Sequence, residues 1–254
     1  MFPDVFKLTG RVALITGGSK GLGKAMARGM AEAGADIVIS SRHEEELRPA
    51  LDEILHGTGR RGAYIVADMA QRDEVVRLAE TALEKMGRVD ILVNNAGTNT
   101  PQACDEIKDD DWDRIMEINL HSVMVLTRAL IPQMKARHWG RIIHISSIMA
   151  LVGNAKRNTY CATKAALVGM TRASALDLGE HGITVNCIAP GPFLTDLPGK
   201  LLSQPEKDAF ARMTALNRWG EPNELIGPAL LLASDAGSYI TGETMVVDGG
   251  FVAR

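Results

Sequence analysis

The sequence predicts a three-layer α/β fold in which helices cover both faces of a seven-stranded parallel sheet. Short apolar runs alternate with longer helical patterns along all 254 residues. The runs are continuously apolar, which is typical of strands that are buried on both faces. Strand–helix alternation with short connections gives right-handed crossovers and a doubly wound sheet.

Seven apolar runs are the expected strands, at residues 12–15, 37–39, 64–66, 90–93, 140–145, 183–188 and 244–247. Helices are expected at residues 22–32, 44–55, 73–86, 110–137 and 159–178, the fourth long enough to be bent. No repeat or linker interrupts this order, so we expect residues 1–254 to form a single domain. The irregular stretch 190–218, rich in proline and then helical in pattern, is expected to be a substrate lid.

Composition and charge disfavour several classes of protein. Hydrophobic residues make up 46% and charged residues 23%, the balance of a soluble globular protein. A net charge of −3, a pI near 6.1 and the absence of a basic run give no support to nucleic-acid binding. No apolar stretch approaches the ~20 residues that span a bilayer.

The cysteines and the N-terminal segment favour a cytoplasmic protein. Cys104, Cys161 and Cys187 are scattered and odd in number, as expected of reduced thiols. The first seven residues are too short and too polar for a signal peptide. The six histidines lack the spacing of metal ligands, so no metal site is expected.

A glycine-rich turn follows the first expected strand and opens the first expected helix. Glycines let the backbone turn tightly and approach a pyrophosphate, which lies at the helix N-terminus. In this context the turn predicts a dinucleotide site and a Rossmann fold, although an ordinary tight turn is the alternative. The candidate cofactor-binding residues here are Thr16, Gly17, Ser19, Lys20, Gly21, Leu22 and Gly23.

The end of the second strand indicates which dinucleotide binds. An acid there would bind the ribose of NAD, whereas an arginine accommodates the 2′-phosphate of NADP. The strand ends in Ser40-Ser41-Arg42, with no acid at its tip. Arg42 can pair with a phosphate, Ser41 can hydrogen-bond it, and Lys20 adds positive charge. The sequence favours NADP; NAD stays possible if Arg42 is only a solvated surface cation.

Two further strand ends supply candidate cofactor-binding residues. Asp68, with Met69 beside it, follows the third strand, where an acid could accept a hydrogen bond from the adenine amine. An acid near a helix N-terminus is an equally good interpretation. Asn95, Ala96 and Gly97 end the fourth strand, and small residues there would let a dinucleotide pass close to the sheet.

Tyr160, Lys164 and Ser147 predict a device for proton transfer. Tyr160 and Lys164 are four residues apart on an expected helix, so they share one face. Ser147 follows the fifth strand. A phenol ionises near pH 10, and a cation beside it would lower that pKa. Tyr160 could then take a proton from an alcohol or give one to a carbonyl.

These motifs resemble the short-chain dehydrogenase/reductase family, of the single-domain type. The resemblance covers essentially the whole chain and implies NAD(P)-dependent interconversion of a secondary alcohol and a ketone by hydride transfer. The matching positions are Thr16-Gly17-x-x-x-Gly21-x-Gly23, Asn94-Asn95-Ala96-Gly97, Asn119, Ser147, Tyr160-x-x-x-Lys164, Pro190-Gly191 and Asp248-Gly249-Gly250.

The resemblance also implies a role for each catalytic residue. Tyr160 would be the general acid/base, Lys164 would bind the nicotinamide ribose and lower the phenol pKa, and Ser147 would hydrogen-bond the substrate oxygen. Asn119 would hold a water that relays protons to Lys164, or else simply kink its helix. Pro192 replaces the bulkier residue expected beside the nicotinamide. The residues expected to border the nicotinamide are Pro190, Gly191, Phe193 and Thr195.

Within the family, the chain looks most like the gluconate 5-dehydrogenase branch and its sugar-acid and polyol relatives. The 3-oxoacyl carrier-protein reductases share much of the pattern and are the alternative. They usually dock an acidic carrier with arginines near the pocket mouth. Arg137 is one candidate, but Leu176 occupies the other position. The loop Lys156-Arg157-Asn158 could face an anionic substrate or be a solvated turn.

Two more expectations follow from the resemblance. It implies a homotetramer, with the helices at 110–137 and 157–178 pairing across one interface and the C-terminal strand near another. A dinucleotide-binding regulator without turnover is a third functional hypothesis. It is disfavoured because such proteins typically lose the tyrosine or the lysine, and this chain keeps all four catalytic positions.

Overall fold

A seven-stranded parallel sheet forms the centre of the computed structural model, which describes residues 4–195 and 203–253. The spatial order of the strands is β3-β2-β1-β4-β5-β6-β7. The predicted doubly wound Rossmann fold is confirmed, with small shifts of the strand ends. The strands are β1 (Val12–Thr16), β2 (Asp36–Ser41), β3 (Gly62–Val66), β4 (Ile91–Asn94), β5 (Gly140–Ile145), β6 (Ile183–Pro190) and β7 (Thr244–Val247).

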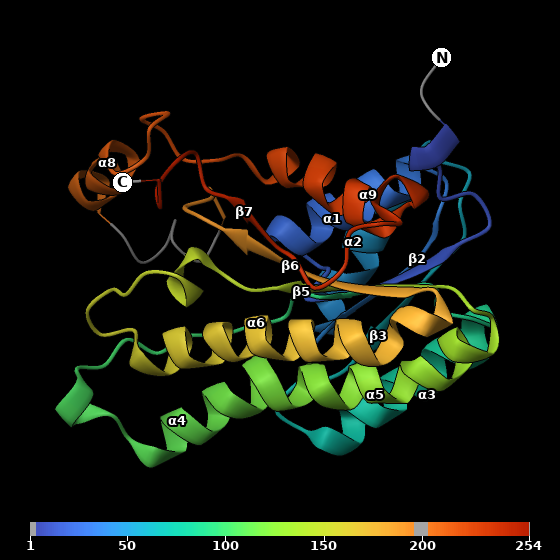
Figure 1. Cartoon of the computed structure of the whole chain (residues 1–254), viewed down its shortest axis with the longest axis horizontal. Helices are drawn as coiled ribbons and strands as arrows, with labels where there is room; N and C mark the ends of the chain where they lie inside the picture. Colours follow the sequence, from blue (N-terminus) through green and yellow to red (C-terminus); the bar gives the residue numbers. More distant parts are fainter. Residues whose placement is uncertain (1–3, 196–202, 254) are drawn as a thin grey trace.

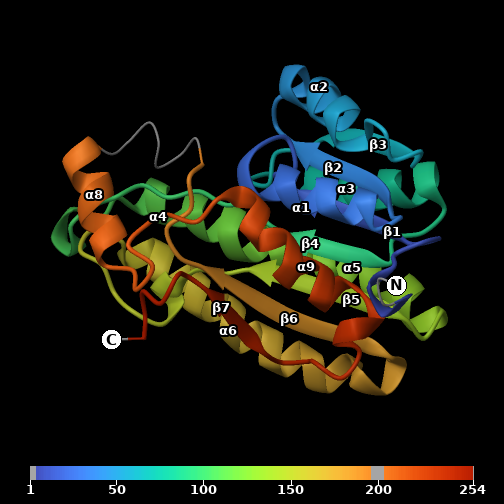
Figure 2. The same ribbon diagram turned by 90° about the horizontal axis from the view of Figure 1, so that it is seen from above.

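Helices cover both faces of the sheet, with α1, α2 and α9 on one face and α3, α5 and α6 on the other (Figures 1 and 2). The helix α9 was not expected, because Gly227 and Pro228 interrupt its pattern. The helices are α1 (Gly21–Glu32), α2 (Glu44–Leu55), α3 (Arg72–Met86), α4 (Asp109–Met116), α5 (Ser122–Ala136), α6 (Asn158–Leu178), α8 (Gln204–Arg212) and α9 (Ile226–Ala233).

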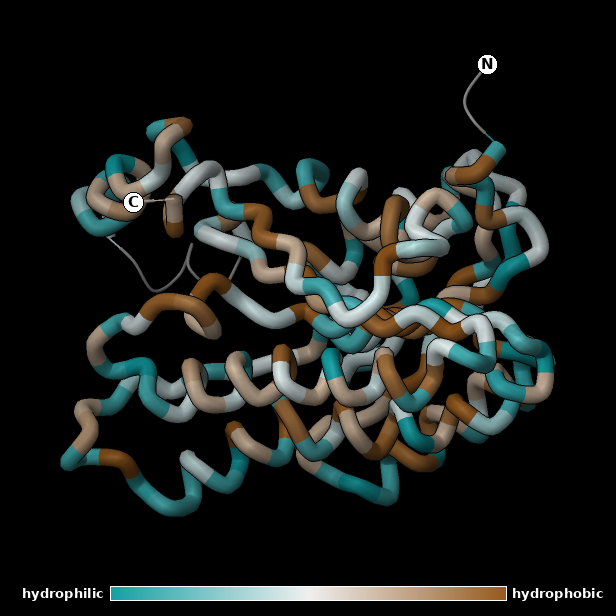
Figure 3. The backbone as a smooth tube through the Cα atoms, in the orientation of Figure 1, coloured by the Kyte–Doolittle hydropathy of each residue, from teal (hydrophilic) through white to brown (hydrophobic). Residues whose placement is uncertain are grey.

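Two apolar layers hold the helices to the sheet, and Figure 3 shows apolar segments along its middle. Successive strand residues point to opposite faces. Ile15 accordingly belongs to the layer beneath α1 and α2, and Leu14 to the layer beneath α3 and α5. Both side chains are fully buried. Since every face of a central strand is covered, the strands read as continuous apolar runs.

The long helix expected at 110–137 is two α-helices joined by a π-helical turn, Glu117–His121. Asn119 lies within this turn and is fully buried. Single π turns inside α-helices are frequent at functional sites. The π-helical turn interrupts the helix that was expected to bend, and it contains the predicted site residue Asn119.

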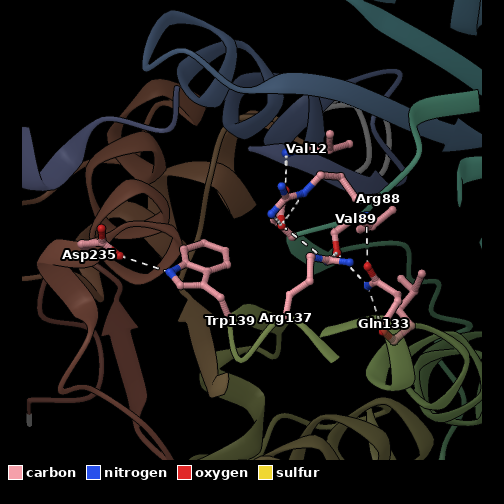
Figure 4. Close-up of polar contacts among 9 residues, drawn as sticks. Val12, Arg88, Val89, Gln133, Arg137, Trp139 and Asp235 are labelled. Atoms are coloured by element: carbon pink, nitrogen blue, oxygen red, sulfur yellow. Dashed lines mark hydrogen bonds and ion pairs between the residues drawn. The ribbon is translucent and has the colours of Figure 1, made fainter. Parts of the chain in front are cut away.

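A network of ion pairs lies at the amino-terminal end of the sheet (Figure 4). Asp90 is fully buried just before β4. Its carboxylate accepts hydrogen bonds from the backbone N–H of Val12 (2.9 Å), from Arg88 Nε (2.9 Å) and from Arg137 Nη2 (3.4 Å). Arg137 is therefore held at the end of the sheet away from the carboxyl ends of the strands. Its expected place near the pocket mouth is wrong.

Three other features bear on the classes of protein considered above. None of the described helices combines the length and apolar character needed to cross a bilayer. Within the described ranges, no cluster of three or more His, Cys, Asp or Glu side chains could hold a metal ion. Cys104, Cys161 and Cys187 are free thiols.

Candidate active site

A cavity of about 340 Å³ opens at the carboxyl-terminal ends of the strands. This is the edge at which open α/β sheets bind ligands. The cavity brings together residues from five separate parts of the sequence. The predicted site residues that line it are Leu22, Asn95, Gly97, Ser147, Tyr160, Lys164, Pro190, Gly191, Phe193 and Thr195.

Tyr160 and Lys164 project from the first turns of α6 into this cavity. The Lys164 ammonium lies 5.5 Å from the centroid of the Tyr160 ring and donates a hydrogen bond to the Ile145 carbonyl (2.8 Å). Lys164 is only 4% exposed. Burial lowers its pKa from 10.5 to about 8, because a charged group loses hydration. At neutral pH the ammonium is still protonated.

The pKa of Tyr160 is raised rather than lowered. Burial is the largest cause, and it exceeds the lowering produced by a hydrogen bond with Ser147 and by the positive charge of Arg157. Lys164 is not among the causes. The structure therefore gives no support to the expectation that Lys164 lowers the phenol pKa. At neutral pH Tyr160 is a protonated phenol.

The two serines after β5 have different surroundings. Ser146 Oγ donates to the Lys164 carbonyl (2.8 Å) and thereby braces the first turns of α6. Ser147 Oγ accepts a hydrogen bond from the Met149 N–H (3.1 Å), and the Ser147 hydroxyl acts to lower the pKa of Tyr160. The choice of Ser147 over Ser146 therefore agrees with the geometry.

Asn119 joins three segments behind the cavity. Its amide nitrogen donates to the Thr98 carbonyl (2.9 Å) and to Thr163 Oγ1 (3.2 Å), and its oxygen accepts from the Thr98 N–H (2.8 Å). A Cβ atom at Gly97 would lie 3.4 Å from the Asn119 oxygen and 3.5 Å from Lys164 Nζ. Glycine therefore keeps space open beside the ammonium group.

The glycine turn fits a dinucleotide. Gly17 and Gly21 both have positive φ, which favours glycine. A Cβ atom at Gly23 would lie 2.3 Å from the Gly17 carbonyl oxygen, so no larger residue fits there. The Thr16 hydroxyl accepts hydrogen bonds from the N–H groups of Asn95 and Ala96, both at 3.0 Å. The turn is thus fixed against the residues that follow β4, as a cradle for a pyrophosphate requires.

The predicted phosphate-binding residues are only partly available. Lys20 donates to Glu46 Oε1 (2.9 Å) and Ser19 donates to Glu46 Oε2 (3.1 Å). Arg42 is exposed and makes no hydrogen bond or ion pair with any other described residue. The Ser41 hydroxyl lies beside the backbone of the next turn, at 3.4 Å from its N–H. Of Lys20 and Arg42, Arg42 is the cation that no carboxylate of the described residues pairs with.

Asp68 and Met69 lie after β3, outside the cavity at the catalytic end. Asp68 Oδ1 accepts a hydrogen bond from the Ala70 N–H (2.9 Å). Met69 is buried against the helices of the adjacent layer. One carboxylate oxygen of Asp68 therefore stabilises the turn before α3. This agrees with the interpretation of Asp68 as an acid near a helix N-terminus.

Aromatic residues close the cavity on the side of the 190–218 segment. Phe193 packs against Gly220, where a Cβ atom would lie 2.8 Å from the ring. Phe210 of α8 and Trp219 contact each other edge to face, with ring centroids 5.8 Å apart. Thr195 lies beside Gly21 of the glycine turn. Residues 196–202 of the expected lid lie outside the described part of the chain.

Several lining residues were missed by the motifs. Asn99 follows β4, Met149 and Asn154 follow β5, and Phe210 and Trp219 come from the segment after β6. All belong to the segments that follow the carboxyl ends of strands, where ligands bind in this architecture, although Phe210 lies in α8. Their position was therefore predictable, but no residue pattern distinguished them from other loop residues.

Comparisons with known proteins identify the family of the chain. Residues 17–252 match the family model described as enoyl-(acyl carrier protein) reductase. A 2-dehydro-3-deoxy-D-gluconate 5-dehydrogenase of Dickeya dadantii is 39% identical over 257 residues, covering 100% of both chains. A 3-oxoacyl-[acyl-carrier-protein] reductase of Synechocystis is 37% identical over 246 residues, covering 96% of this chain and 98% of the relative.

A solved structure extends the likeness to three dimensions. The crystal structure of a gluconate 5-dehydrogenase from Burkholderia cenocepacia, in complex with NADP and tartrate, has a TM-score of 0.92 and 37% identity. The match covers 99% of this chain and 98% of that chain. By sequence, fold and coverage, the chain is an oxidoreductase that belongs to the short-chain dehydrogenase/reductase family.

Proposed function

We propose that this protein interconverts a secondary alcohol and a ketone on a sugar acid or a related polyol, with NADP as the preferred cofactor. The observation that carries the proposal is the convergence of Ser147, Tyr160 and Lys164 in one cavity beside Gly97. A hydroxyl, a phenol and an ammonium group there can bind an oxygen and move a proton to or from it.

Each catalytic residue has a distinct task in this proposal. The nicotinamide, when bound, supplies or accepts the hydride. Tyr160, which is protonated at neutral pH, gives its proton to the carbonyl oxygen, and in the reverse direction it takes the alcohol proton. Ser147 donates a hydrogen bond to the same oxygen. Lys164 binds the ribose hydroxyls and keeps positive charge near the phenol. Asn119 holds the water that renews the proton.

The residues of the glycine turn and the strand ends would hold the cofactor. Gly17, Gly21 and Gly23 admit the pyrophosphate, and Arg42 at the end of β2 pairs with a 2′-phosphate. The ion pair of Lys20 with Glu46 takes one cation away from that phosphate. We therefore expect a preference for NADP over NAD that rests mainly on Arg42. The NADP bound to the Burkholderia relative supports it.

Two observations favour a sugar acid over a carrier-bound thioester. Arg137 is engaged by Asp90 at the opposite end of the sheet, and Leu176, in the place of the second docking arginine, is 85% exposed without charge. The relatives named above are a dehydrogenase of a 2-dehydro-3-deoxy-gluconate and a reductase of 3-oxoacyl carrier protein. The test therefore includes one substrate of each class, a keto sugar acid and an acyl thioester.

We also propose that residues 1–254 act as one domain, that the 190–218 segment is its substrate lid, and that the protein is a homotetramer. Large apolar side chains are exposed on the surfaces expected to pair, with Trp112 on α4, Met124 on α5, Leu176 on α6 and Val246 on β7. Light scattering coupled to gel filtration would measure the assembly. A monomer would contradict this part of the proposal.

The test is the consumption of NADPH with 5-ketogluconate and with an acetoacetyl thioester as rival substrates. We expect turnover of the keto acid by the wild type and a fall of about 10²–10⁴-fold in kcat for Tyr160→Phe. Tyr64→Phe is the matched control, since Tyr64 lies on β3 and its hydroxyl contacts Glu44. Its kcat should remain at the wild-type value.

The two substrates separate the alternatives. Tyrosine-dependent turnover of the thioester alone would identify a 3-oxoacyl reductase instead. Activity that Tyr160→Phe retains would remove the catalytic assignment. Replacement of NADPH by NADH in the same assay measures the cofactor preference, and equal kcat/KM values would contradict the role given to Arg42.

A further inference from the structure

The charges around the catalytic cavity are unequal. Arg157 and Lys164 are the charged residues among those that line it, and no carboxylate of the described chain does so. Lys164 is buried and its ammonium is bound to the Ile145 carbonyl. Arg157 takes part in none of the ion pairs formed by the described residues. Its guanidinium group is thus the cation that a ligand in the cavity would meet.

The backbone holds Arg157 in place. It is the residue that precedes α6, and its carbonyl accepts a hydrogen bond from the Cys161 N–H (2.8 Å). On the other side, the chain at Arg157 pairs with Gln102, whose N–H donates to the Lys156 carbonyl (3.1 Å). Arg157 and Tyr160 both line the cavity, and the positive charge of Arg157 acts on the Tyr160 phenol. The cation therefore has a fixed base beside the reacting phenol.

Neutral polar groups lie in the same cavity. Asn99, after β4, and Asn154, after β5, both line it. The side-chain oxygen of Asn99 is buried and has no hydrogen-bond partner among the described residues. A buried acceptor without a partner indicates a missing donor, and a ligand hydroxyl can supply one. Large apolar side chains, those of Met149, Phe210 and Trp219, also line the cavity.

From this arrangement we propose that Arg157 binds the carboxylate of the substrate while Asn99 accepts a hydrogen bond from one of its hydroxyls. The substrate is then a polyhydroxy carboxylate, anchored at one end by the guanidinium group and presenting its carbonyl or alcohol carbon to Ser147 and Tyr160. A guanidinium group matches a carboxylate with two parallel hydrogen bonds. The inference rests on the proposed function and adds the residue that selects the substrate class.

A pair of ligands that differ only at one carbon tests the inference. Gluconate carries a carboxylate where sorbitol carries a neutral CH₂OH group, and both are alcohols. Titration of each ligand into the protein saturated with NADPH gives a dead-end complex, because the cofactor is already reduced. Binding is then measured by calorimetry without turnover.

The matched variants are Arg157→Gln and Lys156→Gln. Each variant removes one positive charge, and the two positions are adjacent in the sequence. Lys156, however, is exposed and does not line the cavity. Hydrogen bonds to charged groups are strong enough that Arg157→Gln should weaken gluconate binding about 10- to 100-fold. Sorbitol should bind the wild type and both variants equally weakly. Lys156→Gln should bind gluconate within about threefold of the wild type.

Arg157→Lys is the second variant, and it preserves the charge but not the two parallel hydrogen bonds. We expect it to bind gluconate more tightly than Arg157→Gln but more weakly than the wild type. If Arg157→Gln does not fold, Arg157→Lys takes its place in the comparison with Lys156→Gln.

Three outcomes would overturn the inference. Gluconate affinity that Arg157→Gln leaves unchanged would remove Arg157 from the site. An equal loss for gluconate and sorbitol would mean that Arg157 only supports the cavity structurally. A wild type that binds sorbitol as well as gluconate would exclude a carboxylate site. The last result leaves the proposed oxidoreductase function intact, because that function fails only if no ketone is reduced in a Tyr160-dependent way.

Discussion

The two ends of the sheet treat buried charge in opposite ways. At the amino end, Asp90 is fully buried, and it is bound by Arg88, Arg137 and a backbone N–H. At the carboxyl end, Lys164 is almost as deeply buried, but its partner is one carbonyl oxygen. No carboxylate of the described chain lies within ion-pair distance of Lys164.

The difference separates structure from function. A buried charge without an opposite charge destabilises the fold, and such groups concentrate at sites that perform chemistry. A buried charge with several partners supports the folded structure, and removal of one partner lowers the free energy of unfolding. The amino end should therefore determine stability and the carboxyl end activity. Three experiments test this division, from the largest expected effect to the smallest.

Lys164→Met replaces the buried cation with an apolar side chain of similar length. We expect kcat/KM to fall by about 10²–10⁴-fold, as for other losses in acid–base machinery. Burial lowers the pKa of Lys164 from 10.5 to about 8, so the charged lysine destabilises the folded protein, and the full cost is present below about pH 8. The free energy of unfolding should therefore stay the same or rise, by at most about 3 kcal/mol at pH 7. A clear loss of stability in urea unfolding would contradict the division.

Asp90→Asn removes the anion and leaves two arginines facing a neutral amide. Breaking a buried ion pair costs about 3–5 kcal/mol. We expect the lower end, about 3 kcal/mol, because Arg88 and Arg137 are partly exposed. Urea unfolding measures the loss, and kcat of the folded variant should be close to that of the wild type. A variant that keeps its stability but loses activity would reverse the roles of the two ends.

His144 sharpens the comparison through pH. It is fully buried near the carboxyl end of β5, beside Asn94, and its Nε2 atom has no partner among the described residues. Burial, and then the positive charge of Lys164, lower its pKa from 6.5 to about 4. Between these values the unfolded chain binds the proton and the folded chain does not. Stability should therefore decrease as the pH falls from 6.5 to about 4, by about 3 kcal/mol.

Urea unfolding at pH 7 and pH 4.5 measures this dependence. His144→Gln should reduce the difference between the two pH values, because the titrating group is gone. His56→Gln, at an exposed position, is the control and should behave as the wild type. If all three proteins lose stability equally, other groups cause the acid sensitivity and the lowered pKa of His144 is not relevant.

The fold could be predicted from the sequence because its signals are local. A continuous apolar run shows that a strand is covered on both faces, and Gly87, with φ of 77°, ends α3 where the pattern predicts. The helix α9 was missed because its glycine and proline conceal the periodicity of an apolar helix. The same local logic placed Tyr160 and Lys164 on one helix face.

The electrostatics of the site could not be predicted, because they depend on residues that are distant in sequence. Spacing predicts that Lys164 is near Tyr160, but only the packed structure shows that burial dominates the phenol pKa. Lys20 pairs with Glu46, twenty-six positions away, and Arg137 with Asp90, forty-seven positions away. Neither pair leaves a pattern in the sequence, so both cations were assigned to ligands.

The side chain of Asn119 has a consequence for how the protein is made. One amide joins Thr98, twenty-one positions earlier, to Thr163, forty-four positions later. A continuous fragment that stops before α6 can contain the contacts with Thr98, but not the contact with Thr163, which lies within α6. A ribosome-bound chain, which emerges from its amino end, would thus present the partners of the Asn119–Thr98 contacts before Thr163 is available. Contacts between such distant positions form late, since a long loop must close first.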